Sequence, residues 1–238
     1  SYACYLSDQG QAAIEARRIV APALADAFDR VGPHLECAGE IFGGDRVAGR
    51  SPFKNGDDAA VACGRSASAA GSLCRGVIAL LDAGNPYAAG ALVRQLVEIE
   101  YLVWCFATEP TAAAAWLRSS SDERRKHWGP ASLRKRANKV FRSNSYWSHC
   151  ELGGHLTPVL SGSLLYSSEV NRELMWPDFI SHAAHAWEGL VAAAKDHTEF
   201  NIDLLALTAK EPRIAVANAL DDWYATDYFL TSAARDAS

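Results

Sequence analysis

Apolar residues recur at alternating spacings of four and three between Pro86 and Phe106, and this pattern predicts one long helix. Its seam consists of Leu92, Leu96, Ile99, Val103 and Phe106. The other faces of this stretch are barely more polar, and a helix that is apolar nearly all round is normally buried on several sides. We therefore expect this helix in the core of a helical bundle.

Three charged residues interrupt this apolar helix: Arg94, Glu98 and Glu100. Arg94 and Glu98 lie one turn apart on the same face, and charges in apolar surroundings are tolerated mainly when they are paired and hydrogen-bonded. We predict that Arg94 and Glu98 form a buried ion pair. Both are also candidate substrate-binding residues.

The segments before this helix predict two more helices and a glycine-rich loop. The first helix runs from about Asp8 to Val31, where Gly32-Pro33 ends it. Residues 39–55 are rich in glycine and proline and fit a loop. A second helix begins near Asp57-Asp58 and is followed by a tight connection at residues 84–86. The second and third helices are therefore expected to form an antiparallel hairpin at the centre of the bundle.

Beyond the hairpin the pattern stays helical. Thr108 and Pro110 predict the start of a short helix that ends near Leu117. Gly129-Pro130 divides the next stretch into two short helices, and a loose segment is expected up to about Met175.

Two proline signals divide the last part of the chain. Trp176-Pro177-Asp178 predicts the start of a long helix to about His197. Glu211-Pro212 is expected to separate a helix over residues 201–209 from a closing helix. The buried stripe predicted for that closing helix is Ile214, Ala217, Leu220, Tyr224, Tyr228 and Leu230.

The chain shows neither strict apolar alternation nor an internal repeat, so the predicted class is all-α, an up-and-down helical bundle around the central hairpin. We predict a single domain over residues 1–238, with an N-terminal helix and glycine-rich loop in 1–56 and the bundle core in 57–238. The six scattered cysteines contain no Cys-x-x-Cys pair and are expected to be reduced thiols. The apolar runs are too short or too charged to cross a bilayer, which predicts a cytoplasmic protein without a membrane partner.

Positive charge is concentrated in one segment, although the whole chain carries a net charge of -5. The cations are Arg124, Arg125, Lys126, Arg134, Lys135, Arg136, Lys139 and Arg142. Such a run usually forms a solvated helix face, which is the plain structural interpretation. The functional interpretation is a binding surface for RNA, with Arg134, Arg136 and Lys139 as candidate contacts.

The most unusual stretch, residues 146–158, holds two aromatic residues, two histidines and a double glycine before a proline. Gly153-Gly154 predicts the end of a short helix, so that non-helical backbone positions His155. Such placement is common around functional sites, which makes Tyr146 a candidate substrate contact and His155 a candidate catalytic residue. An equally good interpretation is that His155 fixes the turn through a hydrogen bond to the core.

Arg142 and His149 form the candidate catalytic pair. They are seven residues apart, which on a continuous helix returns to nearly the same face. A histidine can move a proton at a ribose hydroxyl while an arginine stabilises charge developing on phosphate, as metal-free RNA cleavage requires. Pairs at such a spacing also occur by chance.

The pattern Arg94-Gln-Leu-Val-Glu98 after a helical hairpin, followed by a segment ending in His155-Leu-Thr-Pro158, resembles a group of uncharacterised bacterial helical proteins. That group is similar to HEPN domains, helical bundles often found in toxin and phage-defence systems. The resemblance covers roughly residues 73–158. It implies a bundle that dimerises and, in active members, an arginine-histidine motif that cleaves RNA without metal. Arg142 and His149 fit that motif at the long end of its spacing, although the motif usually lies within a terminal helix.

The leading hypothesis is therefore a HEPN-like protein that binds or cleaves RNA, needs no cofactor or metal, and forms a homodimer. A second hypothesis is a catalytically silent interaction module that holds a partner protein or senses a ligand. A third is a metalloenzyme built from the pairs Glu151 and His155, Asp178 and His182, and His182 and His185, with Glu98 as a further ligand. The plain alternative for His182 and His185 is that they are ordinary exposed or hydrogen-bonded helix residues.

Overall fold

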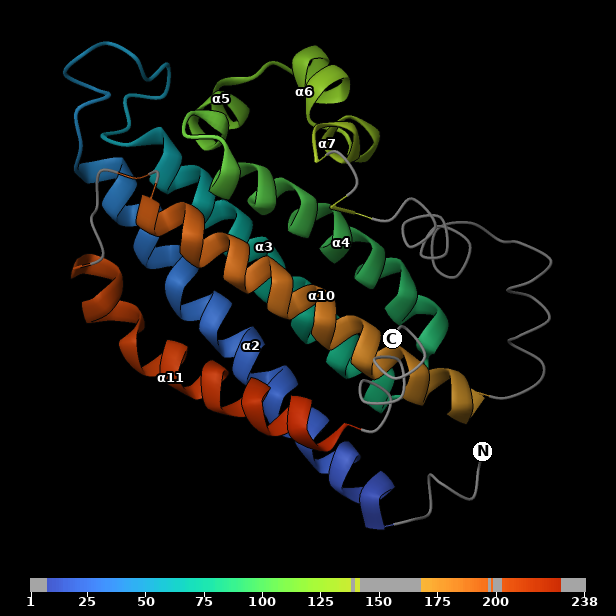
Figure 1. The fold of residues 1–238 in the computed structure, drawn as a ribbon. Coiled ribbons are helices and arrows are strands. Elements are labelled where there is room, and N and C mark those ends of the chain that lie inside the picture. The colour runs from blue at the N-terminus through green and yellow to red at the C-terminus, as the bar shows by residue number, and fades with distance from the viewer. Residues whose placement is uncertain (1–7, 138–139, 142–167, 197, 199–202, 228–238) are drawn as a thin grey trace.

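A computed structural model describes residues 8–137, 140–141, 168–196, 198 and 203–227 (Figure 1). The five long helices are α2 (Asp8–Ile41), α3 (Asp58–Asp82), α4 (Pro86–Thr108), α10 (Ser168–Asp196) and α11 (Asp203–Thr226). The three short helices are α5 (Ala112–Arg118), α6 (Ser121–His127) and α7 (Pro130–Arg136). Over these ranges there is no strand, which confirms the predicted all-α class.

Helices α2, α3, α4 and α10 pack around one hydrophobic core. Figure 1 shows α2, α4 and α10 running in the same direction, with α3 antiparallel to them. Helix α11 covers α2, α5 packs on α3 and α4, α7 packs on α4, and α6 contacts α7. None of the helices, as far as the structure describes them, is long and apolar enough to cross a membrane.

The central hairpin has the predicted ends. Asp57 caps α3 by accepting hydrogen bonds from the backbone N–H groups of Ala59 and Ala60 at 2.9 and 3.0 Å. Gly84 adopts a φ of 72°, a left-handed conformation that glycine enters without strain. Asn85 then caps α4 by accepting from Ala88 N at 3.1 Å. These local signals confirm the antiparallel α3–α4 hairpin.

The predicted end of the first helix at Gly32-Pro33 is wrong, because α2 continues to Ile41. Gly32 is buried against α3, where a Cβ atom would lie 2.4 Å from Ser68 Oγ. The glycine therefore permits close helix packing rather than ending the helix. Pro33 is exposed on the outside of α2, where the packing of the helix outweighs the one hydrogen bond that proline removes.

Two other proline signals were also wrong. Pro177 lies inside α10, which already begins at Ser168 rather than after a loose segment, and the aromatic rings of Trp176 and Phe179 beside it are buried. Pro212 lies inside the continuous helix α11 and is itself buried. Tertiary packing supports each helix through its proline, at Trp176 and Phe179 in α10 and at Pro212 itself and Val216 in α11.

The buried face of α11 also differs from the prediction. Ile214 is 52% exposed and Tyr224 is 44% exposed, whereas Val216 and Trp223 are buried. Among the described members of the predicted stripe, Leu220 is the one that lies inside, while Tyr228 and Leu230 lie outside the described residues. A smaller difference occurs after α4: Thr108 belongs to α4 itself, and α5 begins at Ala112.

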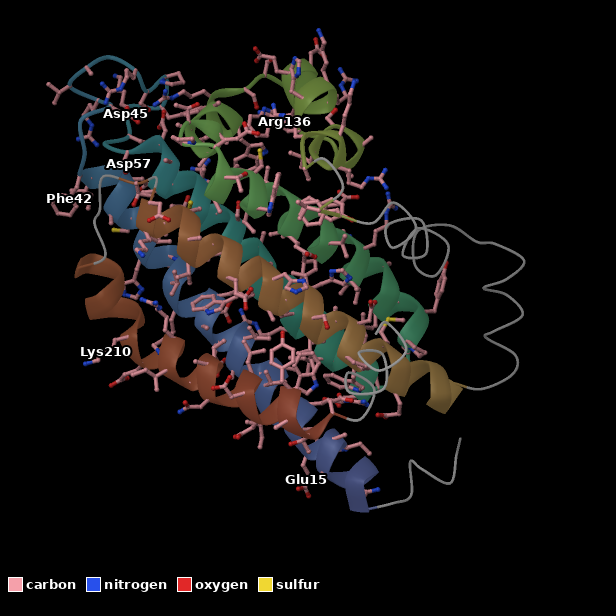
Figure 2. All side chains as sticks on the ribbon, in the orientation of Figure 1. Glu15, Phe42, Asp45, Asp57, Arg136 and Lys210 are labelled. Carbon is pink, nitrogen blue, oxygen red and sulfur yellow. The ribbon has the colours of Figure 1, made fainter. Side chains whose placement is uncertain are left out.

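One arginine fixes α5 to the start of α3 and to the loop before it, the region where Figure 2 labels Asp57 and Asp45. Arg118 donates to Asp58 Oδ2 at 2.6 Å and to Asp45 Oδ2 at 2.7 Å. Burial opposes the charged form of Asp45, but its hydrogen bonds from the Asp58 backbone and from Arg50, together with the Arg118 charge, hold its pKa below the ordinary value. Hydrogen bonds and ion pairs from Arg50 and Arg118 to Asp45 and Asp58 thus hold the loop between α2 and α3 in place.

A second buried network ties α2, α10 and the end of α11 together. Arg17 donates to both carboxylate oxygens of Asp227, at 2.7 and 3.0 Å, and to Glu173 Oε2 at 3.1 Å. The Trp223 indole donates to Asp227 Oδ2 at 2.8 Å. Asp227 is completely buried and the Arg17 side chain is 3% exposed, so both charges depend on this pairing.

Candidate functional site

Helices α6 and α7 form a small unit, residues 121–136, that presents the cation-rich part of the chain. Ser120 and Glu123 make a capping box at the start of α6, with Ser120 N donating to Glu123 Oε2 at 2.7 Å. Gly129 and Pro130 start α7 as predicted. No residue of α6 is buried, and Leu133 is the buried residue of α7. Helix α6 therefore faces outward, while α7 contacts the bundle through Leu133 and its half-buried neighbours.

This unit contains six cations and two carboxylates. Its exposed cations are Arg124, Arg125, Lys126, Lys135 and Arg136. Asp122 pairs with Arg125, and Arg136 Nη1 lies 3.7 Å from Glu109 Oε2. The excess positive charge on a solvated surface is compatible with both interpretations made from the sequence.

A groove of about 470 Å³ lies between the α6–α7 unit and helices α3 and α4. Its apolar lining comes from Leu73, Ile99, Leu102, Trp128 and Leu133. Gln95 and Glu98 add polar groups from α4. The Arg136 guanidinium lies over the Trp128 ring, 4.6 Å from its centroid, which places a cation at the wall of the groove.

The pair of Arg94 and Glu98 is present, but its predicted burial is wrong. Arg94 Nη2 lies 3.6 Å from Glu98 Oε1, and the two side chains are 29% and 37% exposed. Glu98 is accessible because it lines the groove rather than the bundle interior. Of the predicted substrate-binding residues, Glu98 lines the groove, Arg136 contacts the Trp128 ring at its edge, and Arg134 is half-buried beside Leu133.

The predicted catalytic residues Arg142, His149 and His155 lie outside the described residues, as do Lys139 and Tyr146. The same holds for Glu151 of the metalloenzyme alternative. These assignments stay predictions.

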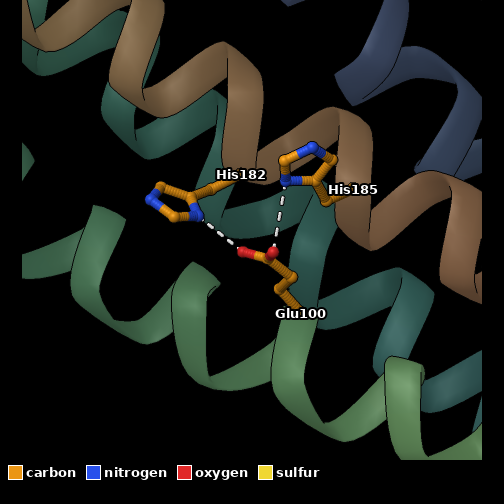
Figure 3. Close-up of side chains that lie close together, drawn as sticks. All are labelled: Glu100, His182 and His185. Carbon is orange, nitrogen blue, oxygen red and sulfur yellow. Dashed lines mark hydrogen bonds and ion pairs between the residues drawn. The ribbon is translucent and has the colours of Figure 1, made fainter. Parts of the chain in front are cut away.

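The described histidines of α10 meet a carboxylate of α4 inside the bundle. His182 Nδ1 lies 2.5 Å from Glu100 Oε2, and His185 Nδ1 lies 3.2 Å from Glu100 Oε1 (Figure 3). Asp178 Oδ1 lies 3.6 Å from the other ring nitrogen of His182. The side chains of Glu100 and His182 are 8% and 13% exposed, whereas that of His185 is 53% exposed. The cluster is therefore buried on one side and open to solvent on the other.

Each group in this cluster shifts the proton affinity of its neighbours. Burial opposes the charged form of His182, but hydrogen bonds to Asp178 and Glu100 outweigh it and raise the pKa of His182 to about 9. The hydrogen bond to Glu100 likewise raises the pKa of His185. Burial opposes ionisation of Glu100, and the two imidazoles outweigh that effect and lower its pKa. The carboxylate and the two imidazoles thus stabilise one another's charged forms.

The metalloenzyme alternative offered Glu98 as a further ligand beside the histidines, and this was wrong. The carboxylate that meets them is Glu100, two residues further along α4. Residues two apart on a helix point about 200° away from each other, so Glu98 and Glu100 face different surroundings. The available signal was a second carboxylate in an apolar helix, together with two histidines at an i, i+3 spacing. Their contact spans 82 residues of sequence, and no local pattern specifies it.

No family model, curated protein or solved structure matches this chain.

Proposed function

We propose that this protein binds single-stranded RNA on the α6–α7 unit, with an unstacked base held in the adjoining groove. The observation that carries the proposal is the placement of exposed cations on α6 and α7, next to an apolar groove whose wall on this side comes from Trp128, Pro130 and Leu133. Proteins that bind single strands combine positive charge along the backbone with apolar or aromatic surfaces on which bases stack. The HEPN-like resemblance supports the same class of ligand.

The groove has a size and a lining that suit a base. Its volume of about 470 Å³ falls within the range of small-molecule pockets. Trp128 and Leu133 offer apolar contact, while Gln95 and Glu98 offer hydrogen bonds to a base edge. Phosphates on either side of that base then meet the cations of the α6–α7 unit.

Cleavage is the second part of the proposal. In this mechanism His149 moves the proton of the ribose hydroxyl and Arg142 stabilises charge on the phosphate, with His155 as an additional catalytic group. RNA cleavage that persists in EDTA and disappears in His149→Ala supports this assignment. Binding without turnover leaves the protein as an RNA-binding module.

We also propose a homodimer, on the resemblance alone. Light scattering of the full chain tests it: a mass of twice 25.7 kDa supports the dimer, and a monomeric mass contradicts it.

The binding test uses fluorescence anisotropy with a labelled single-stranded RNA at several salt concentrations. The triple variant Arg125→Gln, Lys126→Gln, Lys135→Gln removes three exposed cations of the unit. The slope of log affinity against log salt is negative, and each lost phosphate contact reduces its magnitude by about 0.7. The triple variant should therefore show a slope that is less steep by about 2. The matched control, Lys195→Gln, Lys210→Gln, Arg213→Gln, removes three exposed cations from α10 and α11. Figure 2 shows Lys210 far from Arg136, on the other side of the bundle.

A second variant tests the groove. Ala69→Phe puts a large ring into the groove from the exposed side of α3, and Ala79→Phe puts the same ring on an exposed position of α3 outside the groove. We expect weaker RNA binding in the first variant alone. Equal losses in the charge variant and its control, or no RNA binding by the native sequence, would contradict the proposal.

A further inference from the structure

The cluster of Glu100, His182 and His185 has the composition of a metal site. The donor atoms that the three side chains offer all lie within 4.8 Å of one another. The two histidines come from one face of α10, one turn apart, and the carboxylate comes from the helix packed against it. In Figure 3 both rings turn toward the same carboxylate.

The donor set narrows the type of metal. Two imidazole nitrogens and one carboxylate oxygen suit zinc and the other divalent first-row transition ions, whereas magnesium and calcium prefer oxygen donors. Three protein donors leave at least one position for water or another ligand, as in sites that are not purely structural.

The surroundings of the cluster add two features that a metal site needs. Asp178 lies 3.6 Å from Nε2 of His182, the nitrogen opposite the one that faces Glu100. A carboxylate on the outer nitrogen fixes the tautomer and orientation of a metal-binding histidine. His185, with about half its side chain exposed, provides a route from solvent to the buried carboxylate.

We propose that Glu100, His182 and His185 bind one divalent first-row transition metal ion, with Asp178 as a positioning residue on His182. A buried carboxylate between two imidazoles needs positive charge, which either a metal ion or imidazole protons supply. Metal binding displaces those protons, so the protonated cluster is the competing state of the same site. This inference is independent of the proposed RNA binding, which uses another part of the protein.

The test is a titration of the full chain, freed of metal with a chelator, with Co²⁺ and then Zn²⁺. We expect one Co²⁺ per chain, visible-range absorption bands of a nitrogen- and oxygen-bound ion, and their loss when Zn²⁺ replaces it. Glu100→Gln and His185→Gln should each weaken binding at least about 10-fold, and Asp178→Asn should weaken it about 10- to 100-fold.

Two exposed histidines on other helices, His34 and His127, provide matched controls, and His34→Gln and His127→Gln should bind Co²⁺ like the native sequence. His185→Gln changes a half-exposed side chain, so it keeps the test informative where Glu100→Gln does not fold. No stoichiometric binding by the native chain, or binding unchanged in His185→Gln and Glu100→Gln, overturns the proposal. RNA binding measured on the same variants in EDTA should remain native.

Discussion

Replacing Asp227 with alanine tests whether the buried charge network holds the two ends of the described chain together. Asp227→Ala removes two charged hydrogen bonds from Arg17, at 2.7 and 3.0 Å, and leaves the Trp223 indole without its acceptor. Arg17 then keeps its contact with Glu173 but loses its closest negative charge.

The expected cost follows from these contacts. A hydrogen bond to a charged group contributes about 1.5–3 kcal/mol, and breaking a buried ion pair from one side costs about 3–5 kcal/mol. We therefore expect the free energy of unfolding to fall by about 3–5 kcal/mol in Asp227→Ala. For a chain of this size, that loss lowers Tm by roughly 6–20 °C.

Urea unfolding followed by circular dichroism measures this change. Asp221→Ala, on the exposed face of the same helix, is the control and should change stability by less than about 0.5 kcal/mol. The triple variant Arg17→Met, Glu173→Leu, Asp227→Leu removes all three charges and should recover most of the loss, because apolar residues of similar volume can replace a buried ionic network. An Asp227→Ala protein as stable as the Asp221→Ala control would show that the Arg17–Asp227 pair does not stabilise the fold.

Three further predictions concern packing, pH and thiol chemistry. Gly64→Ala should lower the free energy of unfolding in urea by about 1–3 kcal/mol, because its Cβ would lie 2.5 Å from a backbone nitrogen of α2. The control is Gly129→Ala, whose Cβ would meet its nearest neighbour at 3.4 Å. Equal losses of stability in the two variants would contradict this prediction. Because the folded-state pKa of Asp45 is lowered, its stabilising effect is present above its ordinary pKa of 3.8 and is lost as pH falls through the lower folded-state pKa. The stability difference between the native sequence and Asp45→Asn should therefore shrink from about pH 5 downward, through 3.8 and below, and an unchanged difference would count against it. Iodoacetamide should modify the exposed Cys37 well before Cys63, whose burial raises its pKa to about 12, and early labelling of Cys63 by mass spectrometry would contradict its burial.

Local sequence signals predicted much of the helical framework. Asp57, Gly84 and Asn85 set the ends of the central hairpin through contacts within a few residues, and they behave as predicted. Ser120 and Glu123 likewise cap α6 locally. Such signals can be interpreted without knowledge of the fold.

The errors occur where tertiary packing overrides a local breaker. Gly32 would normally weaken a helix, but here it allows α2 to approach Ser68 of α3, and the helix continues. Pro177 and Pro212 lie in helices whose buried sides support them. The helix propensity of a segment does not predict which other helix will pack against it.

The candidate sites depended on contacts that no local pattern encodes. Arg17 and Asp227 are 210 residues apart, and Glu100 and His182 are 82 residues apart. The sequence identified Glu100 as an unusual charge in an apolar helix, but its partners follow only from the packing of α4 against α10. The groove beside Trp128 is likewise a product of three elements that meet in space.

The most direct test of the RNA-binding account is photochemical crosslinking of the native chain to a single-stranded RNA that carries 4-thiouridine, followed by peptide mass spectrometry. We expect crosslinks within residues 121–136, including Trp128, and their loss in Ala69→Phe. Crosslinks confined to α2 and α11 would contradict it.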